Sequence, residues 1–171
     1  MLERSKNEIV IKDSCILFDL IELNLMKDFF QFDLTAFTTP QVIAEITDDE
    51  QLREITNYIE SGKLNIDSIG AYETIIEIAE QYVALSIADS SVLELAVRRN
   101  AVLLTSDGSL RRISMSKNLR VRGVLWIIEE LYGKQIITVE VALQKLQMYS
   151  EINARAPFKE IQNLIKKLQQ L

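Results

Sequence analysis

The sequence predicts an α/β fold: a three-layer parallel β-sheet flanked by helices, with a C-terminal helical extension. Residues 8–21 begin with a strand-like run that passes through a polar turn into a helix, as an α/β unit does. Residues 101–105, Ala-Val-Leu-Leu-Thr, are the continuous apolar run expected of a central parallel strand covered on both faces. Beyond residue 133 the pattern is helical without strands. We therefore expect a domain over residues 1–133 and a helical extension over 134–171 packed on it.

Each element follows from local pattern and from residues that begin or end helices. Pro40 favours the start of a helix, because proline is tolerated in the first turn, and Ser61-Gly62 and Gly133 end helices. The predicted strands cover residues 8–12, 34–39, 63–67, 101–105 and 119–124. The predicted helices cover residues 15–21, 40–46, 48–60, 72–85, 86–100, 109–114, 125–132, 138–149 and 157–171.

Composition excludes several classes of protein. Apolar residues make up 48% and charged residues 26% of the 171 residues, which is ordinary for a soluble globular protein. The longest apolar runs are too short to cross a bilayer, and no extended apolar segment follows a basic start. A single cysteine excludes an intrachain disulfide. We expect a cytoplasmic protein that does not bind membranes.

The chain contains no histidine. This excludes every mechanism in which an imidazole of this chain is the base, including Ser-His-Asp and Cys-His arrangements. It also disfavours zinc, which prefers nitrogen and sulfur ligands. A metal ion bound here would be held by oxygen, so the expected cofactor is Mg²⁺ or Mn²⁺.

Four acids fall where a metal site would form. Asp13 follows the first strand, Glu45 lies in the helix after the second strand, Asp89 begins the helix before the central strand, and Asp107 follows the central strand. Ligands bind beyond the carboxyl ends of the strands in open parallel sheets. Clustered carboxylates repel one another and need a cation, which suits phosphodiester hydrolysis. Three residues flank the acids and could hydrogen-bond metal-bound waters or the phosphate: Ser14, Thr105 and Ser106.

Each acid also has a structural interpretation. Asp107 precedes a helix and would cap it, and Asp89 follows Ser86 at the spacing of a capping box. Asp13 could cap the first helix, and Glu45 could be a solvated helix residue. Acids are commonly found at helix starts because they interact favourably with the helix dipole. The functional interpretation therefore depends on the four acids together.

Four segments resemble the motifs of the PIN-domain family, in order and with matching spacing: residues 9–15, 40–46, 85–96 and 103–111. The resemblance covers residues 8–130. It implies an endoribonuclease, dependent on Mg²⁺ or Mn²⁺, in which Asp13, Glu45, Asp89 and Asp107 are the catalytic metal ligands. Many family members are toxins of toxin–antitoxin pairs. This chain departs from the family in its low pI of about 4.8, in Lys12 before the first acid, and in its longer tail.

Partners are predicted less directly. A net charge of −6 requires a nuclease to concentrate its basic residues locally, or to borrow basic surface from another subunit or partner. Within this chain Arg111 and Arg112, just after the fourth acid, are the best candidates to bind RNA. Four further arginines lie nearby at positions 98, 99, 120 and 122. The apolar stripes of the tail helices would pack on the domain, or form a homodimer surface or a groove for an antitoxin protein.

Two other functions fit the pattern of acids. One is a PIN-like domain that has lost activity and serves as a scaffold binding nucleic acid or protein. The other is a phosphatase-type or response-regulator-like α/β protein, which also places acids at strand ends. Those folds usually need a lysine at a late strand end, and the sequence offers no convincing one.

Overall fold

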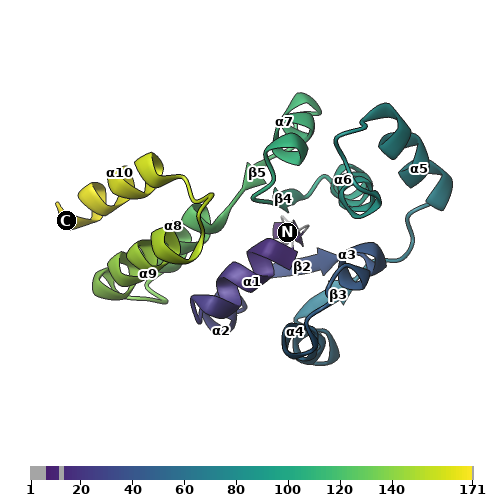
Figure 1. The fold of residues 1–171 in the computed structure, drawn as a ribbon. Helices are drawn as coiled ribbons and strands as arrows, with labels where there is room; N and C mark the ends of the chain where they lie inside the picture. Colours follow the sequence, from purple (N-terminus) through teal and green to yellow (C-terminus); the bar gives the residue numbers. More distant parts are fainter. Residues whose placement is uncertain (1–6, 12–13, 171) are drawn as a thin grey trace, which may run out of the picture. The chain divides into compact units, whose positions relative to one another are not determined.

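The structure of this chain is a computed structural model that describes residues 7–11 and 14–170 (Figure 1). Strands and helices alternate over most of its length. The strands are β1 (Asn7–Ile11), β2 (Leu34–Thr38), β3 (Leu64–Ile66), β4 (Val102–Leu104) and β5 (Val121–Arg122). The helices are α1 (Ser14–Glu22), α2 (Met26–Phe29), α3 (Pro40–Ala44), α4 (Asp49–Glu60), α5 (Tyr72–Gln81), α6 (Ile87–Arg99), α7 (Gly108–Ser116), α8 (Val124–Gly133), α9 (Val139–Ile152) and α10 (Phe158–Gln169).

The contacts divide the chain into two compact units. The sheet unit comprises Met1–Leu17 and Asp33–Arg122, within the described ranges, and the helical unit comprises Phe18–Phe32 and Gly123–Leu171. Helix α1 contributes its first residues to one unit and its later residues to the other. Both units are thus assembled from separate stretches of sequence, and the boundary expected after residue 133 stays a prediction.

The sheet is parallel throughout, with the strand order β3-β2-β1-β4-β5. The predicted parallel α/β architecture is therefore confirmed. The chain builds outward from β1 through β2 to β3, and then crosses back to β4 on the other side of β1. Strands β1 and β4 pair in register up to Ile11 opposite Leu104. A reversal of this kind creates a crevice at the carboxyl ends of the two strands, where open α/β sheets bind ligands.

Side-chain caps set where several helices of the sheet unit begin. Thr39 accepts a hydrogen bond from the Val42 amide, and Pro40 follows it in the first turn of α3, as predicted. Asp48 caps α4 through the amide of Gln51. Helix α6 ends at Asn100, whose φ of 50° is the left-handed conformation that asparagine tolerates at a helix end.

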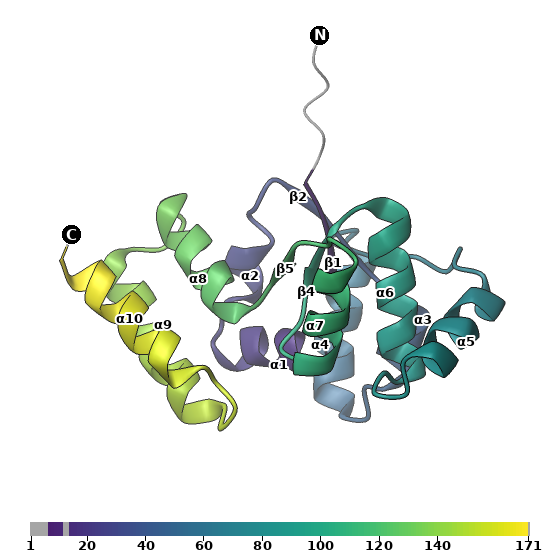
Figure 2. The same ribbon diagram turned by 90° about the horizontal axis from the view of Figure 1, so that it is seen from above.

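The core of the sheet unit lies between helices α6 and α7 and one face of the sheet. All three residues of β4 are buried, and Leu103 packs in one cluster with Val92 and Leu95 of α6, Leu110 of α7 and Val121 of β5. Helix α5 lies beside α6 (Figure 2). Helix α6 is thereby covered on more than one side, which accounts for its unusually long run of buried residues.

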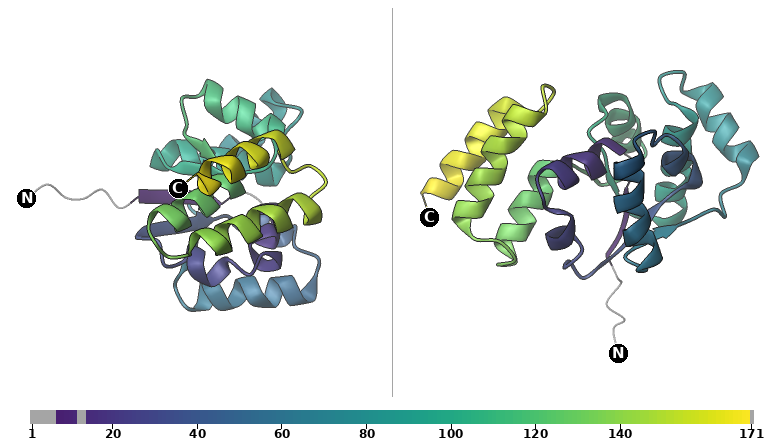
Figure 3. Two further views of the ribbon diagram at one scale, coloured as in Figure 1. Left: turned by 90° about the vertical axis from the view of Figure 1, so that its left-hand side faces the viewer. Right: turned by 60° about the horizontal axis from the view of Figure 1, so that its bottom comes forward.

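The helical unit buries an aromatic cluster and pairs its last helices. Phe29 of α2 contacts Phe32 edge to face, with ring centroids 5.7 Å apart, and Phe32 in turn contacts Trp126 of α8. Helices α9 and α10 lie side by side (Figure 3). Leu146 of α9 and Ile161 of α10 are fully buried within this unit. Much of the predicted apolar stripe of the tail is therefore core.

The structure differs most from the predicted elements at three places. The helix expected over residues 72–85 ends at Gln81, because Tyr82 leaves the helical conformation and Val83 is almost fully exposed. The last strand shrinks from residues 119–124 to Val121–Arg122, and α8 already begins at Val124. The short helix α2 was not predicted. In the described part of the chain, no helix has the length and apolarity needed to cross a membrane.

Candidate active site

The first predicted site residue cannot be placed. Asp13 lies outside the described residues, and so does the side chain of Ser14, the first residue of α1. The strand before Asp13 is described: β1 ends at Ile11, opposite Leu104 of β4. The candidate site is therefore built from the three other acids and the residues around them.

Glu45 and Asp89 are joined through one serine. The Ser86 hydroxyl donates to Oε1 of Glu45 across 3.5 Å, a long contact. Ser86 also caps α6: its Oγ accepts the Asp89 amide at 3.0 Å, while its own amide donates to Oδ2 of Asp89 at 2.8 Å. The predicted capping box is confirmed. Glu45 is exposed and Asp89 is buried, so one acid of this pair reaches solvent and the other faces inward.

Asp107 is held by Thr105 at the end of β4. The Asp107 amide donates to Oγ1 of Thr105, and Oδ1 of Asp107 caps α7 by accepting the Leu110 amide at 2.8 Å. The cap interpretation of Asp107 is thus confirmed too. Within the described residues Oδ2 of Asp107 accepts no hydrogen bond. The carboxylate is partly exposed, so one oxygen serves the fold and the other is available to a ligand.

The main-chain groups of Thr105 also form hydrogen bonds with two arginines. Its amide donates to the carbonyl oxygen of Arg122 on β5, and its carbonyl oxygen accepts Nη2 of Arg111 at 3.0 Å. Thr105 itself is fully buried. This residue, predicted as a supporting one, therefore fixes the geometry of the turn that carries Asp107. Its neighbour Ser106 is exposed and lies beside the acid in the same turn.

The acidic side chains are suitable ligands for a hard divalent ion, but the structure does not bring them all close together. Among residues 7–11 and 14–170, no three acidic or cysteine side chains lie close enough together to hold a metal ion. The groups that could contribute are all carboxylate oxygens, the ligands that Mg²⁺ and Mn²⁺ prefer. Glu45 and Asp107 each reach solvent. The described acids fit such an ion by chemistry, but Glu45, Asp89 and Asp107 do not lie close enough together here to hold it as one group.

Sequence reasoning missed the most strongly paired acid of the sheet unit. Asp67 follows β3, and its side chain is 1% exposed. Both oxygens accept hydrogen bonds from Arg98, at 2.9 and 3.3 Å, and Oδ2 also accepts Nε of Arg99 at 2.9 Å. Burial alone would raise the pKa of Asp67, but the bonds from Arg98, the Ile69 amide and Arg99 lower it to about 2.

This network changes the interpretation of two arginines. Arg98 also donates to Glu94 at 2.8 Å, and that bond, followed by the one to Asp67, raises the pKa of its guanidinium. The guanidinium of Arg99 lies 3.8 Å from the centre of the Phe37 ring. Arg98 and Arg99 were candidates for RNA contact on sequence alone. In the structure the guanidinium groups of both arginines are instead paired with acidic residues of the same chain.

Of the four other candidate arginines, one is half-buried and three are exposed. Arg111, predicted to bind RNA, is half-buried and directed at the Thr105 carbonyl. Arg112, the other predicted contact, is exposed, as are Arg120 and Arg122. Arg111 is therefore placed to hold the turn of Asp107, whereas Arg112 is free to meet a ligand from solution.

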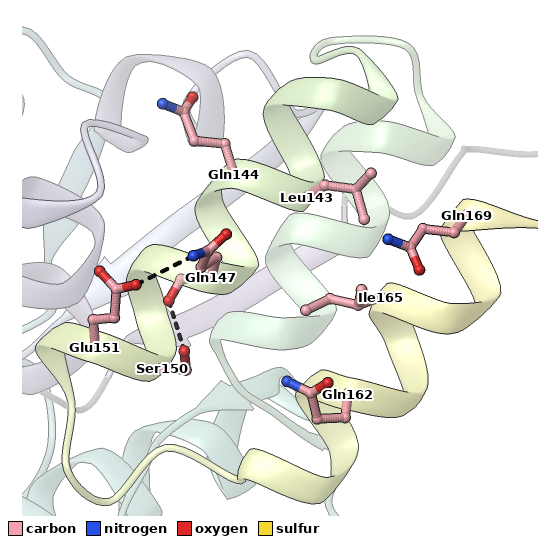
Figure 4. A pocket seen from close by; sticks show the side chains of 8 residues that line it. All are labelled: Leu143, Gln144, Gln147, Ser150, Glu151, Gln162, Ile165 and Gln169. Atoms are coloured by element: carbon pink, nitrogen blue, oxygen red, sulfur yellow. Dashed lines mark hydrogen bonds between the residues drawn. The ribbon is translucent and has the colours of Figure 1, made fainter.

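The helical unit contains a pocket whose lining residues are far from these acids in the sequence. It has a volume of about 400 Å³ and opens between α9 and α10 (Figure 4). Its lining consists of Leu143, Gln144, Gln147, Ser150, Glu151, Gln162, Ile165 and Gln169. Glu151, its single ionisable group, accepts a hydrogen bond from Gln147. Amides, a hydroxyl and aliphatic groups beside a single carboxylate supply no acid–base pair, so we place the chemistry at the sheet edge and not in this pocket.

Comparison with known proteins identifies the family. A family model described as PIN domain matches residues 9–170. The crystal structure of PAE2754 from Pyrobaculum aerophilum is similar in fold, with a TM-score of 0.51 at 14% sequence identity, over 74% of this chain and 97% of that one. A search of the curated proteins finds no match. Because the family model spans nearly the whole sequence, including the helices after residue 133, the chain belongs to the PIN-domain family.

Proposed function

We propose that this chain is a metal-dependent endoribonuclease that hydrolyses RNA phosphodiester bonds. PIN domains are typically nucleases and generally use divalent metal ions. The observation that carries the proposal is the arrangement around Asp107: a partly exposed acid, with one available oxygen, follows the strand beside the topological switch point. That is where an α/β sheet binds its ligand.

The metal would be held by Asp13, Glu45, Asp89 and Asp107. When bound, Mg²⁺ or Mn²⁺ lowers the pKa of water and stabilises charge on a phosphate, which suits a chain that has no histidine to act as base. Ser86 links Glu45 to Asp89, and Thr105 with Arg111 holds the turn of Asp107. These neutral and cationic residues position the acids without adding negative charge to the group.

The decisive measurement is thermal melting of the wild type and of Asp107→Asn, each with EDTA and with Mn²⁺. Clustered carboxylates repel when no ion is present, so Mn²⁺ should raise the wild-type Tm by mass action. Asparagine caps a helix about as well as aspartate. The variant should therefore keep its Tm in EDTA and lose the response to Mn²⁺.

Cleavage of a labelled single-stranded RNA in Mn²⁺ completes the test. Removing groups that merely orient a metal ligand costs about 10–100-fold in activity, so the loss of a ligand in Asp107→Asn should cost at least about 100-fold. A wild type that shows neither a Mn²⁺-dependent rise in Tm nor cleavage would overturn the proposal. The inactive PIN-like scaffold would then be the better description.

The toxin role, the antitoxin partner and the homodimer stay predictions. The toxin role depends on the family resemblance, whereas the dimer and the antitoxin groove were predicted from the apolar stripes of the tail helices. A size-exclusion measurement with light scattering would test the dimer directly. The buried apolar residues of α9 and α10 already pack within the helical unit. A dimer or antitoxin surface there would have to use the remaining residues, such as Leu143 and Ile165 in the α9–α10 pocket.

A further inference from the structure

We propose that one end of the sheet unit is a binding surface for the phosphates of single-stranded RNA, formed by Arg112, Lys117, Arg120 and Arg122. This group is called the basic strip below. The inference rests on the proposed function and gives it a direction, because it states over which side of the site the RNA strand lies. It assigns Arg111, one of the two arginines expected to bind RNA, to a different task.

Charge is strongly segregated along the sheet unit. Between residues 108 and 122 the sequence has five basic residues and no acidic one, in a chain whose net charge is −6. These residues form α7, the connection over residues 117–120 and β5, and β5 is the edge strand next to β4. A local positive field of this kind is what an acidic nuclease needs to bring a polyanion to its site.

The opposite end of the same sheet has the opposite charge. Helix α4 with its cap contains five acids and one base. Helix α4 packs on β3, the other edge strand. Phosphates would be repelled from the β3 end and attracted to the β5 end, so the sheet unit offers RNA a single favourable side.

The side chains of the basic strip are open to solvent. All four are exposed, and in the described part of the chain none of them forms a salt bridge. The Nζ atom of Lys117 lies 5.4 Å from the centre of the Tyr82 ring. The strip thus differs from Arg98 and Arg99, whose charges are already paired with Asp67 and Glu94.

The strand geometry connects the strip to the acids. Arg120, the residue just before β5, and Arg122, at its end, are both exposed, whereas Val121 between them is buried, so the two arginines lie on the opposite side of the backbone from Val121. Their side chains are therefore spaced by about 7 Å along the strand, an interval suited to neighbouring phosphates of an extended chain. Arg122 is at the carboxyl end of β5, where its carbonyl oxygen accepts the Thr105 amide. The same Thr105 holds Asp107, so the main chain of β5 lies next to the turn of the proposed site, and the guanidinium of Arg122 donates to the Val121 carbonyl oxygen at 3.1 Å.

The experiment measures RNA binding without cleavage. A fluorescein-labelled, mixed-sequence 20-nucleotide RNA is titrated with the full chain in EDTA, and anisotropy gives Kd at several salt concentrations. The test variant is Arg120→Gln/Arg122→Gln. Its matched control is Arg53→Gln/Lys63→Gln, which removes the same charge from exposed positions at the acidic end.

Each phosphate contact with a single strand contributes about 0.7 to the slope of log K against log salt. The test variant should lose about 1.4 of that slope and bind RNA about 10–30-fold more weakly at 0.1 M salt. The control should bind as the wild type does. A second variant, Arg112→Gln/Lys117→Gln, should show a similar loss, and it preserves the test should the β5 variant fail to fold.

Equal binding by the test variants and the control would overturn the inference, as would a wild type that does not bind the RNA. Polyglutamate that competes as well as unlabelled RNA would also overturn it, because the strip would then be a surface for acidic protein. A chain that binds RNA through the strip but cleaves none in Mn²⁺ would overturn the proposed function and leave this inference standing. The two proposals can therefore fail separately.

Discussion

Asp67 and Asp107 each follow a strand of the same parallel sheet, yet their surroundings differ completely. Asp67, after the edge strand β3, is buried and receives Arg98 and Arg99 on its two oxygens. Asp107, after β4, is partly exposed and caps α7 with one oxygen. An acid at a strand end thus stabilises the fold when both of its oxygens are paired with cationic side chains. It becomes a candidate ligand when an oxygen is left accessible.

The difference arises from which helix end meets each acid. The last turn of α6 brings two consecutive arginines to Asp67. The first turn of α7 brings one main-chain amide, that of Leu110, to Asp107, and this neutral donor leaves the negative charge in place. The two regions should accordingly respond in opposite ways to loss of the carboxylate charge. Asp107→Asn should remove the Mn²⁺ response with little change in stability.

The largest effect on stability is expected for Asp67→Asn. Removing one partner of a buried ion pair is strongly destabilising, at about 3–5 kcal/mol, because the remaining charges are left without compensation. Arg98 and Arg99 keep some solvent exposure, so we expect the lower end, about 3 kcal/mol, in urea unfolding at pH 7. The Mn²⁺-dependent rise in Tm should survive. A loss below about 0.5 kcal/mol, or a lost Mn²⁺ response with normal stability, would remove the distinction between the two acids.

A pH titration sharpens the same comparison. The folded-state pKa of Asp67 is about 2, below its ordinary value of 3.8. The unfolded state therefore binds the proton more readily, and the stabilisation is complete above pH 3.8 and is lost as pH falls through 2. The difference between the two pKa values corresponds to a contribution of about 2 kcal/mol to the free energy of unfolding.

Urea midpoints of wild type and Asp67→Asn at several pH values between 2 and 6 would measure this contribution. The variant is the control for all other carboxylates, which titrate in both proteins. The gap between the two free energies of unfolding should narrow by about 2 kcal/mol toward pH 2. If the difference between the two free energies of unfolding stayed constant over this range, the charge of Asp67 would not contribute to stability.

The smallest effect is expected for Ser86→Ala. The substitution removes the cap of α6 and the contact with Glu45, and loss of a serine cap costs about 1 kcal/mol. Cleavage and the Mn²⁺ response should weaken as well, because Asp89 and Glu45 lose their common partner. Ser90→Ala, in the same turn but without a bond to either acid, is the matched control. Equal Mn²⁺ responses of the two variants would show that Ser86 only caps the helix.

Much of the fold could be predicted from local pattern. The apolar run of β4, Pro40 at the start of α3 and the Ser86–Asp89 capping box each encode a feature within a few residues. The end of α5 at Gln81 and the two-residue length of β5 could not, because apolar residues continue past both ends. There the local pattern is ambiguous, and packing against the rest of the unit decides.

The four acids predicted the family, while the metal site that they would form stays a prediction. The order and spacing of Asp13, Glu45, Asp89 and Asp107 indicated the PIN-domain family, and the family is confirmed. Asp67 was missed, because an acid after an edge strand has no local signal that distinguishes it from Asp107. Its partners lie more than thirty residues away on α6.

By itself, the sequence determined the element types, the parallel α/β class, the lack of an imidazole base and the run of basic residues from 108 to 122. Each of these depends on residue identity or on short-range periodicity. Tertiary structure alone decided which charges are already paired. It joined Asp67 to Arg98 and Arg99, turned Arg111 toward Thr105 and left Arg120 and Arg122 exposed at the edge strand β5, the first just before it and the second at its end. The reason is physical: the strength of a charge interaction depends on distance and burial, and only the fold sets these across long stretches of sequence.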